Sequence, residues 1–251
     1  PSGLQGEFLK SVGGLSFDTE SGVGVVAWIE GVLEPSPLRG LMFTYDEFGN
    51  ILIDPAGVID LYAPASGADV KRADVRLNQS GELEIAIVEK LPGASTNRAV
   101  LYQPDLPAFS VLGTGCFAVD ATGVCYDDAW GAVHWNSDGT QIFMQAYSSL
   151  SEKNALFRYH NVNGNWLEGE VLMTYENTVG IMAVSADDLL VYQFTEIQRR
   201  KNGKIASRTP FTAMIDSELC SPLECVPEDG TVLPFDLNRW SGGWTKSGGL
   251  L

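Results

Sequence analysis

The chain repeats one alternation of apolar and polar positions four times. Each copy has a short apolar segment, a polar turn rich in Asp, Asn, Ser and Gly, and a second apolar segment; the copies span residues 14–30, 73–89, 132–147 and 181–195. Asn, Asp and Ser side chains bond to nearby backbone in turns, and Gly supplies positive φ angles there. The flanking segments are rich in β-branched and aromatic residues, which favour strands. The pattern therefore predicts a β-hairpin in each copy.

Further strands are expected after the hairpins. The third strand of each unit is predicted at residues 40–45, 98–103, 155–159 and 209–215, and a fourth at 49–54, 165–175 and, in part, 115–126. Only residues 69–76 and 218–225 resemble helical segments, and Pro222 weakens the second because proline disrupts a helix interior. The chain is therefore expected to be all-β.

Repeated four-stranded units of roughly 40–50 residues are typical of β-propeller blades. One such unit cannot bury both of its faces alone, so neighbouring sheets must stack. We predict a single β-propeller domain over residues 1–251, with four or five blades or as part of a larger ring, and with repeats near residues 14–54, 73–110, 132–175 and 181–216. A β-sandwich or jelly roll is the alternative architecture.

The third copy contains the segment His134-Trp-Asn-Ser-Asp-Gly-Thr140. With its flanks, residues 132–144, it resembles the aromatic-Ser-x-Asp-Gly hairpin of TolB-like β-propellers. The resemblance implies a propeller over about residues 14–215 and assigns no catalytic residue. TolB-like propellers usually have six or seven blades, so a compact ring, a fragment of a longer chain and an arc completed by a partner all stay open. Residues 239–251 are expected to begin a fifth hairpin or to supply a closing strand.

The charge balance restricts the partners. The chain has 251 residues with 16 basic and 32 acidic side chains, a formal net charge of −16. Nucleic acid is excluded as a partner because phosphate contact needs a basic surface. The chain has no apolar run approaching the roughly 20 residues that a membrane-spanning helix needs, so no span is expected.

The cysteines form two local pairs in the sequence. Close spacing favours the disulfides Cys116–Cys125 and Cys220–Cys225, although other connectivities are open. Free thiols and a zinc site are the alternatives, and the spacing fits zinc poorly. Paired cysteines indicate an oxidising compartment, so the protein is expected to be extracellular, on the cell surface or periplasmic.

No constellation of residues indicates a defined reaction. His134 and His160 are interpreted as structural residues, and the G-x-S-x-G nucleophile motif is absent. The adjacent acids Asp187 and Asp188 are explained by turn chemistry, and no full calcium-loop motif is present. We therefore predict no catalytic residue, metal ligand or cofactor from the sequence.

Two groups of residues are candidates for binding. Asp127, Asp128 and Trp130 precede or begin the third hairpin, where a propeller commonly binds ligands, and a Trp beside two acids suits sugar stacking or cation contact. A basic cluster stands out in the acidic chain and is interpreted as the loop between the second and third strands of the fourth unit: Arg199, Arg200, Lys201 and Lys204. This cluster would bind an anionic partner. The alternative is a solvated hairpin turn whose charges prevent aggregation at the edge of the sheet.

Divergent loops on a repeated frame suit recognition more than one shared chemistry. The main hypothesis is a secreted or cell-surface module, not an enzyme, that binds a protein partner or its own copies. One alternative is a polysaccharide-active enzyme, a glycoside hydrolase or lyase, with carbohydrate as its partner. The other is a structural subunit of a surface fibre or layer.

Overall fold

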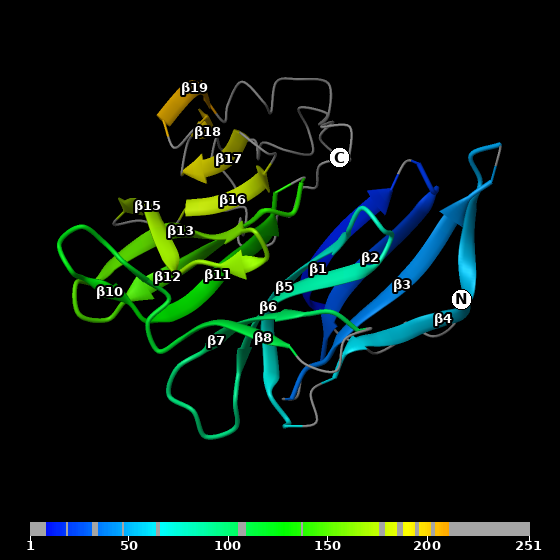
Figure 1. The fold of residues 1–251 in the computed structure, drawn as a ribbon, viewed down its shortest axis with the longest axis horizontal. Coiled ribbons are helices and arrows are strands. Elements are labelled where there is room, and N and C mark those ends of the chain that lie inside the picture. The colour runs from blue at the N-terminus through cyan, green and yellow to red at the C-terminus, as the bar shows by residue number, and fades with distance from the viewer. Residues whose placement is uncertain are drawn as a thin grey trace, which may run out of the picture.

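The computed structural model describes residues 9–18, 20–31, 35–46, 48–63, 66–104, 109–136, 138–175, 179–184, 188–193, 196–201 and 204–210. These residues form four sheets and no helix, and all strand pairs are antiparallel except the pair β9–β15 (Figure 1). Blade 1 comprises β1 (Leu9–Asp18), β2 (Val23–Glu30), β3 (Leu38–Tyr45) and β4 (Ile51–Tyr62). Blade 2 comprises β5 (Asp69–Leu77), β6 (Leu83–Lys90), β7 (Arg98–Tyr102) and β8 (Ser110–Thr114).

Blade 3 is the largest sheet. Its main strands are β11 (Asp128–Trp135), β12 (Gln141–Ser148), β13 (Lys153–Val162) and β15 (Gly169–Tyr175). The short strands β9 (Ala118–Val119) and β10 (Cys125–Tyr126) extend its outer edge, and β14 (Asn165–Trp166) pairs with β13. Blade 4 comprises β16 (Val179–Val184), β17 (Asp188–Gln193), β18 (Glu196–Lys201) and β19 (Lys204–Pro210).

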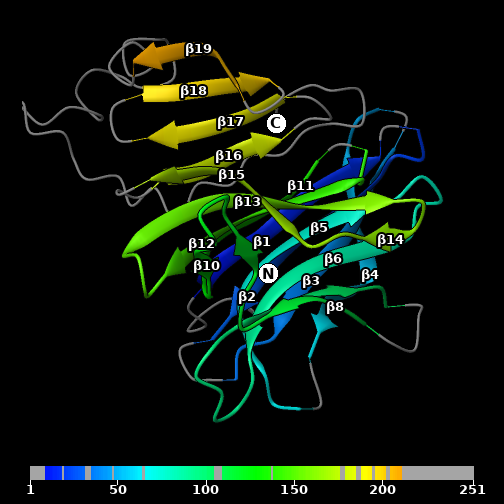
Figure 2. The same ribbon diagram turned by 60° about the vertical axis from the view of Figure 1, so that its left-hand side comes forward.

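The sheets follow one another around an axis. The first strand of each blade lies beside the first strand of the next, so that β1 contacts β5, β5 contacts β11, and β11 contacts β16 (Figures 1 and 2). Inner strands that meet at a hub, with later strands radiating outward, define a β-propeller. The predicted all-β propeller is confirmed, and the described residues form four blades where the sequence predicted four or five.

Turn chemistry explains why the hairpins form where the sequence predicted them. The Asn78 Oδ1 atom accepts hydrogen bonds from the backbone N–H groups of Ser80 and Glu82. The Asn136 Oδ1 atom accepts one from Gln141 in the same way. In each turn the third residue after the Asn is a Gly, with a φ of 78° at Gly81 and 72° at Gly139. Such angles favour glycine, so these turns are encoded locally.

The blades are held together by side chains from alternate positions. On β6, Ile85 and Ile87 pack against blade 1, whereas Ala86 and Val88 pack toward blade 3. All four are at most 1% exposed. A period of two is the pattern of a strand buried on both faces, so each sheet of a propeller contributes to two cores.

Polar side chains join the inner strands at the hub. The Ser16 Oγ atom accepts a hydrogen bond from the backbone N–H of Leu77 at 2.9 Å, and the Asp74 Oδ2 atom accepts one from Trp135 at 2.8 Å. Inner strands are edge strands, so these bonds satisfy backbone groups that a neighbouring strand would otherwise pair. Gly14 has a φ of 108°, and a Cβ there would lie 2.2 Å from the Asp74 Oδ1 atom. Only glycine allows this approach.

Two strand assignments from the sequence were wrong. Residues 115–126 do not complete blade 2; they form β9 and β10, and β9 pairs in parallel with β15 of blade 3. The third strand of blade 4 is β18, not residues 209–215, since β19 already ends at Pro210. The second error arose because the segment that forms β18 is rich in basic residues, and such a segment was interpreted as a loop. The segment 69–76, which resembled a helix, lies in β5.

Candidate functional site

Each blade has two ends with different connections. The segment that enters the inner strand and the loop between the second and third strands lie at one end, here called the loop face. The turns between the first and second strands and between the third and fourth strands lie at the other end, here called the turn face. The cross-strand register assigns Leu9 and Glu30 of blade 1, and Asp69 and Lys90 of blade 2, to the loop face.

An aspartate begins the inner strand of two consecutive blades at the loop face. The Asp128 Oδ1 atom accepts a hydrogen bond from the Asn97 Nδ2 atom at 2.9 Å, and the same nitrogen donates to the Ala129 carbonyl. Asp69 holds the corresponding place in blade 2, where its Oδ1 atom accepts a hydrogen bond from the Ser36 N–H at 2.8 Å. In both cases the loop of the preceding blade positions the carboxylate.

The two aspartates differ in exposure. Asp69 is 4% exposed and forms an ion pair with Lys71, so it is a buried structural acid. Asp128 is exposed, and no hydrogen bond to its Oδ2 atom is found among the described residues. Asp128 therefore combines a fixed orientation with an oxygen that a ligand can reach.

Asp127 points to a different partner. Its two carboxylate oxygens accept hydrogen bonds from the Ser149 N–H at 3.1 Å and from the Ser149 hydroxyl at 2.8 Å. Burial opposes ionisation of Asp127, but the hydrogen bonds outweigh it and hold the pKa of this carboxyl below its usual value. Leu150, which follows Ser149 in the same loop, is 86% exposed, so the loop face also presents an apolar side chain.

The remaining predicted site residues are placed only in part. The backbone of Trp130 lies in β11, but its side chain is outside the described residues, as are the side chains of Arg199, Arg200, Lys201 and Lys204. The register pairs Lys201 with Lys204 at the tip of the β18–β19 hairpin. This hairpin joins a third and a fourth strand, so the basic cluster belongs to the turn face and not to the loop between the second and third strands. The sequence interpretation, a loop between second and third strands, would have placed the basic cluster at the loop face with Asp127 and Asp128, and the register places it at the other end.

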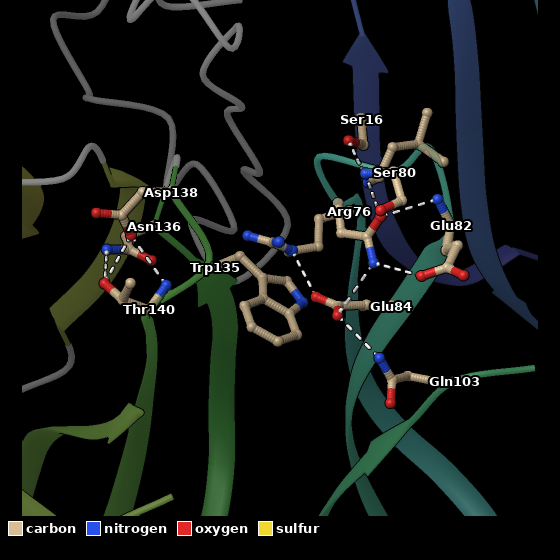
Figure 3. Close-up of polar contacts among 12 residues, drawn as sticks. Ser16, Arg76, Ser80, Glu82, Glu84, Gln103, Trp135, Asn136, Asp138 and Thr140 are labelled. Carbon is tan, nitrogen blue, oxygen red and sulfur yellow. Dashed lines mark hydrogen bonds and ion pairs between the residues drawn. The ribbon is translucent and has the colours of Figure 1, made fainter. Parts of the chain in front are cut away.

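The turn face carries a polar cluster at the junction of blades 2 and 3, drawn in Figure 3. The Arg76 guanidinium lies 5.0 Å from the ring centre of Trp135, and its Nε atom lies 2.7 Å from the Glu84 carboxylate (Figure 3). Trp135 is only 7% exposed, so its ring is used in packing and offers no surface for sugar stacking. A Cβ at Gly139 would overlap this guanidinium. The cluster therefore joins two blades.

His134 lies in the inner strand β11, and Cys125 lies in the outer strand β10 of the same blade. The His134 Nδ1 atom lies 3.6 Å from the Asp74 Oδ2 atom, and His134 is 6% exposed. Cys116 and Cys125 form the expected disulfide, while Cys220 and Cys225 are outside the described residues. In the part of the chain that is described, no cluster of three His, Cys, Asp or Glu residues could hold a metal ion.

Sequence reasoning did not identify Asn97 and Ser149, the residues that position the two acids. Both lie in loops between second and third strands, and only the fold shows which strand such a loop reaches. Among the described residues, no helix is long and apolar enough to cross a bilayer.

Comparison with known proteins gave matches in structure only. No family model matches the chain, and no curated protein matches it. A family 117 glycoside hydrolase from the marine bacterium Zobellia galactanivorans matches with a TM-score of 0.47 and 10% identity, over 80% of this chain and 70% of the other. An alpha-L-arabinanase from Penicillium chrysogenum, complexed with arabinobiose, matches with a TM-score of 0.49 and 12% identity, over 97% and 74%. A fructofuranosidase from Schwanniomyces occidentalis, complexed with fructose, matches with a TM-score of 0.42 and 10% identity, over 80% and 45%.

These matches correct the main functional hypothesis. The sequence favoured a module that binds a protein partner or its own copies, and this was wrong: the matched structures are glycoside hydrolases, in line with the polysaccharide-active alternative. The error arose because the absence of a recognisable motif was taken to favour binding over catalysis. The resemblance to TolB-like repeats stays a prediction.

Proposed function

We propose that the chain hydrolyses glycosidic bonds of a neutral polysaccharide at the loop face, around Asp127 and Asp128. The observation that carries the proposal is the contrast between these adjacent carboxyls. Asp127 has both oxygens engaged by Ser149, whereas Asp128 is exposed and held through one oxygen by Asn97. Glycoside hydrolysis requires two carboxyls with separate roles, and different surroundings are what separate such roles.

The contacts support a division of tasks. The hydrogen bonds from Ser149 favour the ionised form of Asp127, which suits a carboxylate that stabilises positive charge on the sugar ring. Asp128 has an accessible oxygen and suits proton transfer to or from the glycosidic oxygen. The exposed side chain of Leu150 adds an apolar contact for a sugar face at the same end of the blade.

The charge of the chain supports a neutral substrate. A formal net charge of −16 repels polyanions such as uronate polymers. Since lyases act on uronate polymers, hydrolysis is the better fit of the two enzymatic alternatives. The Cys116–Cys125 disulfide supports action outside the cytoplasm, where polysaccharides are met.

The test is hydrolysis of a panel of neutral oligosaccharides, including arabino-oligosaccharides and fructosides, followed by Asp128→Asn. Loss of a general acid or base is expected to lower kcat by about 100- to 10,000-fold. Glu168→Gln is the matched control, because it removes one negative charge from an exposed position on the same blade, and its activity should equal that of the unchanged chain.

Two results would contradict the proposal. One is that the unchanged chain releases no reducing sugar from any member of the panel. The other is that Asp128→Asn retains the activity of Glu168→Gln.

Asp127→Asn should lower kcat while the folded state persists, which near-UV circular dichroism would check.

A further inference from the structure

The loop between β12 and β13 presents the most exposed large apolar side chain in the described part of the protein. Leu150 is 86% exposed, ahead of Phe48 at 80%. No other large apolar side chain that the structure describes at the loop face is exposed. A single exposed leucine is common on protein surfaces, so its surroundings decide whether it has a role.

The backbone around Leu150 is held in one conformation. Ser148 precedes it and is 0% exposed. The Ser148 hydroxyl oxygen accepts a hydrogen bond from the Ser151 N–H at 3.3 Å, and the Ser148 carbonyl accepts one from the Glu152 N–H at 2.9 Å. These bonds close the loop around Leu150, so its side chain is held out toward the solvent.

The same loop contains a strained residue. Glu152 has a φ of 56°, and it shares a positive φ with only one other non-glycine residue of the described part, Asn163. Asn163 precedes Gly164 in a hairpin turn, where asparagine adopts this conformation readily. Glutamate has no such preference, and the conformation costs on the order of 1–3 kcal/mol. Strain of this kind is typical of loops that contact ligands, because the surrounding structure imposes a fixed shape on them.

The loop reaches the candidate site through the residue before Leu150. The Ser149 hydroxyl donates to the Asp127 Oδ2 atom at 2.8 Å, and the Ser149 N–H donates to its Oδ1 atom at 3.1 Å. Adjacent Cα atoms are about 3.8 Å apart, so Leu150 follows this contact directly. Asp128 is held from the opposite direction, by Asn97 of blade 2. Leu150 therefore lies on the Asp127 side of the pair of acids.

We propose that Leu150 binds the sugar ring on which positive charge develops, and so contributes to the choice of sugar at that position. The inference rests on the proposed function, in which Asp127 stabilises that charge and Asp128 transfers the proton at the glycosidic oxygen. The face of a neutral sugar ring carries C–H groups, and contact with a leucine removes apolar surface of both partners from water. Because the loop is already fixed, little conformational entropy is lost when the ring binds.

The first test is the kinetics of Leu150→Ala on the arabino-oligosaccharides and fructosides of the panel. KM should rise about threefold to tenfold, since a contact on one side buries roughly half of a leucine side chain. The value of kcat should stay unchanged, because the contact is present in the ground state and the transition state alike. Leu150→Met should restore KM. Leu167→Ala is the matched control, since Leu167 is 50% exposed at the turn-face end of the same blade.

The second test measures binding without hydrolysis. The full chain carrying Asp128→Asn is titrated with the same oligosaccharides in a calorimeter, with and without Leu150→Ala. The affinity should fall by the same threefold to tenfold as KM rises. Dependence of binding on Leu150 in a chain that releases no reducing sugar would support the contact and contradict hydrolysis.

Three results would overturn the inference. Equal KM values for Leu150→Ala and Leu167→Ala, in a chain that does hydrolyse the panel, would remove the contact and leave the proposed function in place. A fall in kcat at constant KM would mean that the loop only positions Asp127. Absence of any binding to the panel would contradict both the contact and the proposed function.

Discussion

Blades 1 and 2 present equivalent faces to different neighbours. In blade 2 the face formed by Ile85, Ile87 and Val100 is fully buried under blade 1. In blade 1 the face formed by Val26, Trp28 and Leu41 is half-buried. The residue types are alike because a strand with period two must be apolar on both sides wherever two sheets flank it. An apolar pattern on both faces therefore indicates a sheet that packs between two others. The order of the blades along the chain decides which face is fully buried among the described residues.

The largest expected effect concerns the charged pair of the covered face. Glu89 is 0% exposed and bonds to the Tyr62 hydroxyl as well as to Arg98. Glu89→Gln leaves the Arg98 charge without its carboxylate, and breaking a buried pair in this way destabilises by about 3–5 kcal/mol. The free energy of unfolding in urea measures it.

The equivalent change in blade 1 is the matched control. Arg39 pairs with Glu30 and also lies 3.0 Å from Asp60, so Glu30→Gln leaves its guanidinium paired. The expected loss is about 0–1 kcal/mol, because the Arg39 charge keeps a carboxylate partner and its side chain is 34% exposed. Equal losses for the two variants would mean that the two faces are not distinguished by their charged pairs.

A smaller effect is expected from the apolar layer. Ile85→Val gives blade 2 the residue that blade 1 carries at Val26, and deletion of one buried methylene should cost about 0.5–1.5 kcal/mol. Ile51→Val in the outer strand of blade 1 is the control, because Ile51 is 59% exposed and its change should stay within about 0.5 kcal/mol. A loss at Ile51 as large as that at Ile85 would contradict the assignment of the two surfaces.

The smallest effect is a pH dependence at the junction of blades 1 and 2. The Tyr62 hydroxyl donates to the Glu89 carboxylate at 2.8 Å, and burial together with this acid raises the pKa of Tyr62. The unfolded tyrosine ionises first, near pH 10, so this contribution to stability is complete below about pH 10 and is lost as the pH rises further.

Tyr62→Phe should therefore flatten the fall in unfolding free energy between about pH 9 and 11. Comparison with the unchanged chain removes the contribution of the other buried tyrosines, since both proteins share them. An identical slope in the two proteins would exclude Tyr62 as a source of the alkaline loss.

The sequence predicted the parts of the fold that are encoded locally. The hairpins around Asn78 and Asn136 were identified because an Asx turn followed by Gly is specified within five residues in the first and six in the second. The β9–β15 pairing was missed because it is parallel and joins segments far apart in the chain. The β18–β19 hairpin of blade 4 was missed because its strands are rich in basic residues. Asn202-Gly203 is a strong hairpin signal and should have been given more weight than the composition.

The candidate site could be predicted only in part for the same reason. Asp127 and Asp128 were identified by their position before an inner strand. Asn97, which orients Asp128, comes from the loop of another blade, and nothing in the linear sequence shows that it reaches this carboxylate.

The β9–β10 hairpin determines where this chain can be divided. It precedes β11 in sequence, yet it forms the rim of blade 3, and the Cys116–Cys125 bond closes it. A fragment starting at Asp128 would lack that rim and leave β15 as an unprotected edge prone to association. Any excised or transplanted version of blade 3 must therefore start upstream of Cys116, and its production requires oxidising conditions.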